Sequence, residues 1–291
     1  MYFIKGGPGV GKSSLMRRFA AAAEDKGYAV EYFHCSSDPD SLDGVAVPEC
    51  GIGMMDATAP HIYDPSVPGA RDTLISLGDY LDEKALAPHA KEIIRLQSEI
   101  SAKFRRCYRY LAAAQEVLCA ASAEADLGGL EEEWTKYLPT RGGRGQARRL
   151  FASAFTPKGR VDVTDFAHYD RRVSVEIPFG AHASGLMERM AQKAQSRGLD
   201  VILLLDALMP DRAAHVIIPA HGVAFCTETR INRDDHEQGF DRNAYGLLCQ
   251  RAVEQLTAAK SLHDELEQFY VRHMDFAAWQ NQLDKLLLTL P

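Results

Sequence analysis

The sequence predicts an α/β protein with two similar halves, each a strand-and-helix unit followed by a long helical segment. Three observations carry this expectation. A glycine-rich turn separates an apolar strand from an Ala-rich helix at the start of the chain. The sequence matches itself when it is shifted by about 171 residues. Extended helical periodicity covers residues 70–124 and 242–273.

The glycine-rich turn, Gly6-Gly7-Pro8-Gly9-Val10-Gly11-Lys12-Ser13, matches G-x-x-x-x-G-K-[ST] at every fixed position. This pattern is typical of a P-loop, in which glycines let backbone N–H groups approach phosphates and the next helix presents its positive end to them. We therefore expect ATP as the nucleoside triphosphate, with Lys12 on its phosphates and the Ser13 hydroxyl on Mg²⁺. The expected nucleotide-binding residues are Gly6, Gly7, Pro8, Gly9, Val10, Gly11, Lys12, Ser13 and Ser14.

Asp56 ends a mostly apolar segment, residues 50–55, that reads as a buried strand. Ligands of open parallel sheets lie at the carboxyl ends of the strands, where this carboxylate could hold Mg²⁺ through water. The alternative is an aspartate that caps the turn before Pro60. We treat Asp56 as a candidate catalytic and metal-binding residue.

Polar residues follow the expected second strand, residues 30–35. Asp38 and Asp40 could grip a phosphate acceptor, or they could only shape an Asx turn around Pro39. His34 is a candidate catalytic residue that could orient a phosphate or the attacking water. Its alternative is a hydrogen-bonded histidine at a strand end.

The self-match indicates an internal repeat. At the shift of about 171 residues, turn residues and helix positions coincide: Leu15 with Leu186, Gly27 with Gly198, Pro48 with Pro219 and Gly51 with Gly222. We expect two tandem P-loop NTPase-like repeats, 1–145 and 146–291, each a doubly wound, mainly parallel sheet with long helical insertions.

The second repeat carries a degenerate turn, residues 177–184. Ala183 stands in place of the lysine, His182 in place of the last glycine, and Thr227 in place of Asp56. Without the ammonium and the glycines, this turn should bind a triphosphate poorly, so we expect one functional nucleotide site. Asp206 also ends an apolar strand, but the repeat aligns it with Cys35, and we do not assign it to a metal.

The segment between the repeats is basic and glycine-rich. One of its arginines could stabilise charge on a transferring phosphoryl group, or all could belong to a solvated connector: Arg141, Arg144, Arg148 and Arg149.

Composition limits the class of protein. The chain has 291 residues and a net charge of −7, which argues against a general nucleic-acid binder. It has neither a signal peptide nor an apolar run of the ~20 residues that span a bilayer, so we expect a cytoplasmic protein without a membrane partner. The six cysteines show no Cys-x-x-Cys spacing, which argues against a zinc site or a disulfide framework.

Four segments resemble a bacterial, clostridial-type family of tandem P-loop ATPases: 5–14, 31–44, 56–61 and 150–157. The resemblance covers nearly the whole chain and implies ATP binding, with hydrolysis expected from the motifs, but it implies no particular substrate or pathway. The chain departs from the family pattern in two respects. The first repeat lacks a stretch equivalent to 150–170, and the second repeat has lost its P-loop.

Three functions follow from these features. The first is a Mg²⁺-dependent ATPase or ATP-driven switch, in which hydrolysis orders or releases the loop 38–43. The second is a small-molecule kinase whose acceptor is held by Asp38, Asp40 and His34. The third is a nucleotide-sensing scaffold without turnover, whose long helices bind a protein partner.

Overall fold

The computed structural model describes residues 1–59, 62–120, 123–162, 166, 169–230 and 236–280. By packing, the chain forms two compact units. The first unit comprises Met1–Phe104 together with the residues from Leu256 onward, and the second comprises Arg105–Gln255. This division follows three-dimensional packing, whereas the boundary at 145/146 follows the sequence repeat.

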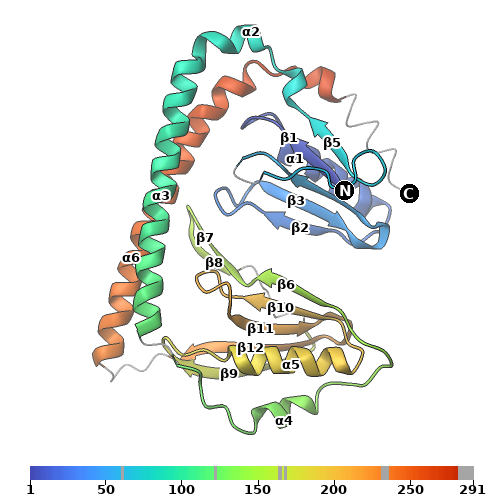
Figure 1. Cartoon of the computed structure of the whole chain (residues 1–291), viewed down its shortest axis with the longest axis vertical. Helices are drawn as coiled ribbons and strands as arrows, with labels where there is room; N and C mark the ends of the chain where they lie inside the picture. The colour runs from blue at the N-terminus through green and yellow to red at the C-terminus, as the bar shows by residue number, and fades with distance from the viewer. Residues whose placement is uncertain (60–61, 121–122, 163–165, 167–168, 231–235, 281–291) are drawn as a thin grey trace. The chain divides into compact units, whose positions relative to one another are not determined.

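The first unit contains a five-stranded sheet in the order β2-β3-β4-β1-β5 (Figure 1). The strands are β1 (Tyr2–Lys5), β2 (Glu31–His34), β3 (Leu42–Val47), β4 (Ile52–Asp56) and β5 (Thr73–Ser76). β1 pairs in parallel with β4 and β5, while β3 pairs antiparallel with β2 and β4.

The sheet is therefore mixed, and the expectation of a mainly parallel sheet is wrong. The reason lies in the connections. Residues 35–41 and 48–51 join β2 to β3 and β3 to β4, and both segments are shorter than the dozen or so residues that a parallel crossover needs. Short connections of this kind force neighbouring strands to run antiparallel.

Helix α1 (Lys12–Asp25) follows β1 and packs against β3. Its Leu15, Met16 and Phe19 recur at helical spacing and are buried in a core with Ile4 and Val45. Because this core clamps both the strand and the helix, it fixes the loop that joins them.

The second unit contains a sheet in the order β6-β10-β11-β12-β9 and a hairpin of β7 and β8. The sheet strands are β6 (Ala147–Phe151), β9 (Arg171–Pro178), β10 (Val201–Leu205), β11 (Ala213–Ile218) and β12 (Val223–Arg230); the hairpin strands are β7 (Ser153–Thr156) and β8 (Gly159–Asp162). Helices α4 (Leu130–Thr135) and α5 (Ser184–Ser196) share a buried core with this sheet.

Four strands of one sheet match four strands of the other in order and in register. Tyr2 pairs with Met54 in the first unit, and Val173 pairs with Phe225 in the second, each 171 residues further along the chain. The bulge between Phe33 and His34 recurs between Leu204 and Leu205. The units differ in their fifth strand, which lies beside β1 in the first and beside β10 in the second.

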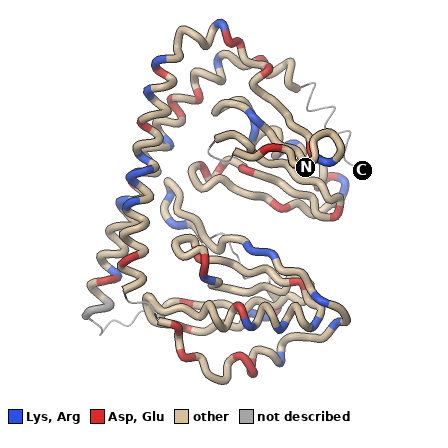
Figure 2. The backbone as a smooth tube through the Cα atoms, in the orientation of Figure 1, with Lys and Arg blue, Asp and Glu red and all other residues tan. Residues whose placement is uncertain are grey.

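Two long helices, α3 (Ala90–Ala120) and α6 (His236–Val271), correspond to the expected helical segments, and a short helix, α2 (Glu83–Leu86), precedes α3. Residues 73–76 of the first segment form β5 instead. Within the first unit, Leu96 and Ile100 of α3 pack with Leu266 of α6. Figure 2 shows acidic and basic residues interspersed along both helices, and no helix in the described ranges is long and apolar enough to cross a bilayer.

Candidate functional site

The P-loop lies between β1 and α1, as the motif predicts. Gly9 and Gly11 adopt positive φ angles of 73° and 94°, a conformation that side-chain-bearing residues rarely adopt. Val10 is fully buried in the core of the unit, so this residue anchors the loop. Gly6 is fixed by Thr58, whose hydroxyl oxygen accepts a hydrogen bond from Gly6 N at 3.2 Å.

The Lys12 ammonium lies within this loop. Its Nζ donates hydrogen bonds to the carbonyl oxygens of Gly6 and Gly7, both at 2.8 Å, and lies 3.6 Å from Asp56 Oδ2. Burial lowers the pKa of Lys12, whereas the Asp56 carboxylate raises it and so favours the charged form. The loop therefore holds a cation beside the carboxylate that the sequence proposes for the metal.

Asp56 ends β4, directly beside β1, where Ile4 is its register partner. Its Oδ1 accepts a hydrogen bond from Thr58 N at 2.8 Å, so the carboxylate also shapes the turn that follows. One carboxylate oxygen thus serves the turn while the other faces Lys12, and the two interpretations of Asp56 are compatible. Ser13 Oγ accepts a hydrogen bond from Leu42 N at 3.0 Å, which ties the first turn of α1 to β3.

These groups line one pocket of about 400 Å³, formed by residues of the first unit. Of the expected nucleotide-binding residues, those that line it are Pro8, Gly9, Gly11, Lys12, Ser13 and Ser14. Asp38, Asp40 and Asp43 line the same pocket. Burial raises the pKa of the neighbouring Cys35 to about 11, so this thiol stays protonated and is no nucleophile at neutral pH.

His34 lies outside the group of residues that line the pocket. It is exposed, and its Nδ1 forms a hydrogen bond with Pro39 O at 2.9 Å. This contact matches the alternative of a hydrogen-bonded histidine at the strand end. The basic segment also contributes no residue to the described pocket lining, and its Arg149 pairs with Glu188 of α5 at 2.7 Å.

Sequence reasoning missed the contribution of α6 to this pocket. Lys260, His263 and Glu267 line it, and Lys260 Nζ lies 3.5 Å from Asp38 Oδ2. The three residues recur at helical spacing, which is the signal that could have pointed to a shared polar face. The P-loop itself is closely covered, since a Cβ atom on Gly7 would come within 2.6 Å of the Tyr270 ring.

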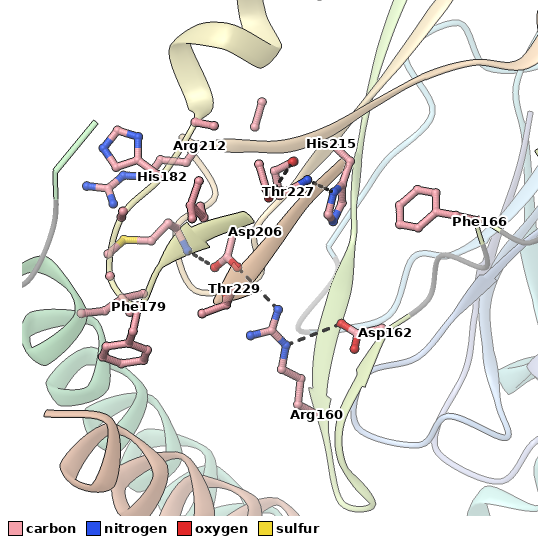
Figure 3. A pocket seen from close by; sticks show the side chains of 18 of the residues that line it. Arg160, Asp162, Phe166, Phe179, His182, Asp206, Arg212, His215, Thr227 and Thr229 are labelled. Atoms are coloured by element: carbon pink, nitrogen blue, oxygen red, sulfur yellow. Dashed lines mark hydrogen bonds and ion pairs between the residues drawn. The ribbon is translucent and has the colours of Figure 1, made fainter. Parts of the chain in front are cut away.

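A second pocket, of about 900 Å³, lies in the second unit at the degenerate turn (Figure 3). It contains the counterparts of the two central residues, Ala183 for Lys12 and Thr227 for Asp56. Asp206 also lines it and accepts hydrogen bonds from Leu208 N and Met209 N. The metal-binding pair of the first unit therefore has no equivalent here.

Comparisons with protein-family models, curated proteins and solved structures found no match to this chain, so its function has to be inferred from the site itself.

Proposed function

We propose that this chain is a tandem P-loop protein of the ATPase family that its motifs resemble, with one functional site for Mg·ATP in the first unit. Lys12 and the loop amides would hold the phosphates, Ser13 would bind Mg²⁺, and Asp56 would hold the metal through water. We infer an ATPase or an ATP-driven switch. A cytoplasmic location belongs to this proposal, since all six cysteines are free.

The convergence of Lys12 and Asp56 carries the proposal. They are 44 positions apart in the sequence, yet Nζ and Oδ2 lie 3.6 Å apart at the rim of a pocket that the P-loop lines. A cation for the phosphates next to a carboxylate for the metal is the arrangement that phosphoryl transfer from Mg·ATP requires. A glycine-rich turn without nucleotide chemistry has no need of either charge.

A small-molecule kinase is the second candidate, and the acidic loop favours it. Asp38, Asp40 and Asp43 line the same pocket as Lys12, where they could hold the hydroxyl or amino group of an acceptor. Asp38 already accepts a hydrogen bond from Ser41 Oγ at 2.8 Å. Its position therefore also fits the turn that the sequence allows as an alternative.

The test is thermal unfolding and phosphate release measured on the purified full chain, with ATP in the presence of Mg²⁺ or EDTA. Mg·ATP should stabilise the protein, by about 2.7 kcal/mol at 100 times Kd, and phosphate should be released slowly. Release that begins only after a mixture of small-molecule acceptors is added would identify a kinase. Stabilisation without any transfer would identify a nucleotide-sensing scaffold, and no stabilisation at all would overturn the proposal.

Replacing Lys260 with alanine should slow phosphate release by about tenfold or more, with a smaller effect on the KM for ATP. Its ammonium faces the pocket beside Asp38, where a cation can stabilise charge that develops in the transition state. Steady-state kinetics checks this expectation. Arg251→Ala is the matched control, because Arg251 lies on the same helix in an ion pair with Glu254 and does not line the pocket. Equal kinetics for the two variants would exclude a role for Lys260.

A further inference from the structure

The pocket at the degenerate turn is larger than the pocket at the P-loop, although its unit has lost the residues that hold Mg·ATP. It lies within the second unit, between the end of β9, the start of α5 and the loop after β10. Its volume of about 900 Å³ falls in the range of small-molecule sites. A half that served only as a scaffold would have no reason to keep a cavity of this size.

The lining excludes a metal-dependent triphosphate. Thr227, the counterpart of Asp56, donates its hydroxyl hydrogen to Ala214 O at 3.0 Å, and its backbone N donates to His215 Nδ1 at 3.2 Å. This second bond leaves the ring proton of His215 on Nε2. Burial lowers the pKa of His215 to about 4, so the ring is a neutral donor at pH 7. The site thus offers donors where the first unit offers a carboxylate.

Cations in the pocket are only partly neutralised by acids. Arg160 lies 3.6 Å from Asp206 and 3.7 Å from Asp162, so its charge is compensated. Arg212 also lines the pocket, and Figure 3 shows its side chain and that of His182 at the same end, next to the start of α5. An arginine close to the first N–H groups of a helix suits a phosphate or carboxylate.

Aromatic rings supply the other wall. Phe179 and Tyr245 line the pocket in an edge-to-face pair, with ring centroids 5.6 Å apart. Phe166 lies on the opposite side in Figure 3, edge-to-face with His215 at 5.0 Å. Such rings favour a flat heterocycle, which they can contact through face or edge.

We propose that this pocket binds a phosphate monoester that carries a planar heterocycle, such as a nucleoside monophosphate, without a metal ion. Arg212 and the start of α5 hold the phosphate, and Phe179 and Tyr245 contact the heterocycle. The proposal goes beyond the ATP site of the first unit and does not depend on it. It makes the second unit a ligand-binding module in its own right.

The test is calorimetric titration of AMP into the full-length Lys12→Ala variant in EDTA, so that binding at the P-loop does not contribute. We expect saturable binding that Arg212→Gln weakens tenfold or more. Arg189→Gln is the matched control, because Arg189 lies on α5 but pairs with Glu131 and does not line this pocket. Circular dichroism establishes that each variant is folded.

Tyr245→Leu gives an independent readout. It should weaken AMP binding while leaving the affinity for ribose 5-phosphate, which lacks the heterocycle, unchanged. Absence of AMP binding up to millimolar concentration, a requirement for Mg²⁺, or equal affinities in the Arg212 and Arg189 variants would each overturn the proposal. Failure of ATP to bind the wild-type P-loop would leave this titration unaffected, so the two proposals can fail separately.

Discussion

Replacing Lys12 with alanine is expected to abolish stabilisation by Mg·ATP and to lower phosphate release by about 100-fold or more. The side chain supplies the positive charge of the loop, and its Nζ is held by Gly6 O and Gly7 O at the position where the P-loop turns into α1. Alanine keeps the helix but leaves the phosphates without an ammonium. Thermal unfolding with ATP and a phosphate-release assay measure both effects.

Lys5→Ala is the matched control for this variant. Lys5 ends β1 one residue before the loop, but its ammonium pairs with Asp64 at 2.5 Å instead of facing the pocket. It should bind and turn over ATP as the wild type does. Normal turnover in the Lys12 variant would mean that the P-loop is not the site of the reaction.

Trp134→Ala is expected to destabilise the second unit by about 3–5 kcal/mol. Trp134 is 1% exposed and stacks on the fully buried Phe225 of β12, with ring centroids 5.1 Å apart and planes 16° from parallel. Removing the indole leaves a large cavity between α4 and the sheet. Urea unfolding followed by far-UV circular dichroism measures the loss.

Trp134→Phe separates packing from a general effect of the substitution, because it keeps an aromatic ring against Phe225 and should cost less. The chain has one other tryptophan, Trp279, buried in the core of the first unit. In both variants its fluorescence reports the first unit alone. An unchanged unfolding midpoint for Trp134→Ala would contradict the assigned core.

The sequence was informative where the chemistry is local. The motif locates Lys12 and Ser13 because a P-loop is a continuous segment, and Asp56 follows from the rule that a polar residue ending an apolar strand lies at the edge of a sheet. Strand pairing then joins the two, since β1 and β4 are neighbours. The repeat offset of about 171 residues recurs in the register of both sheets.

Two features were missed for different reasons. Lys260, His263 and Glu267 reach the pocket from a helix more than 200 residues after the P-loop, and no local pattern encodes such a contact. The antiparallel strands, by contrast, were predictable from the lengths of the connections. His34 shows the opposite error, because a residue type suited to catalysis was weighed without the turn that binds it to Pro39.

Met274 and Trp279 are buried in the core of the first unit, against residues from the opening strands. A fragment that stops near residue 145 would therefore expose apolar surface and should aggregate. During synthesis, the N-terminal strands leave the ribosome long before these two side chains exist. The ATP site that we propose is thus completed only when the last part of the chain has been translated.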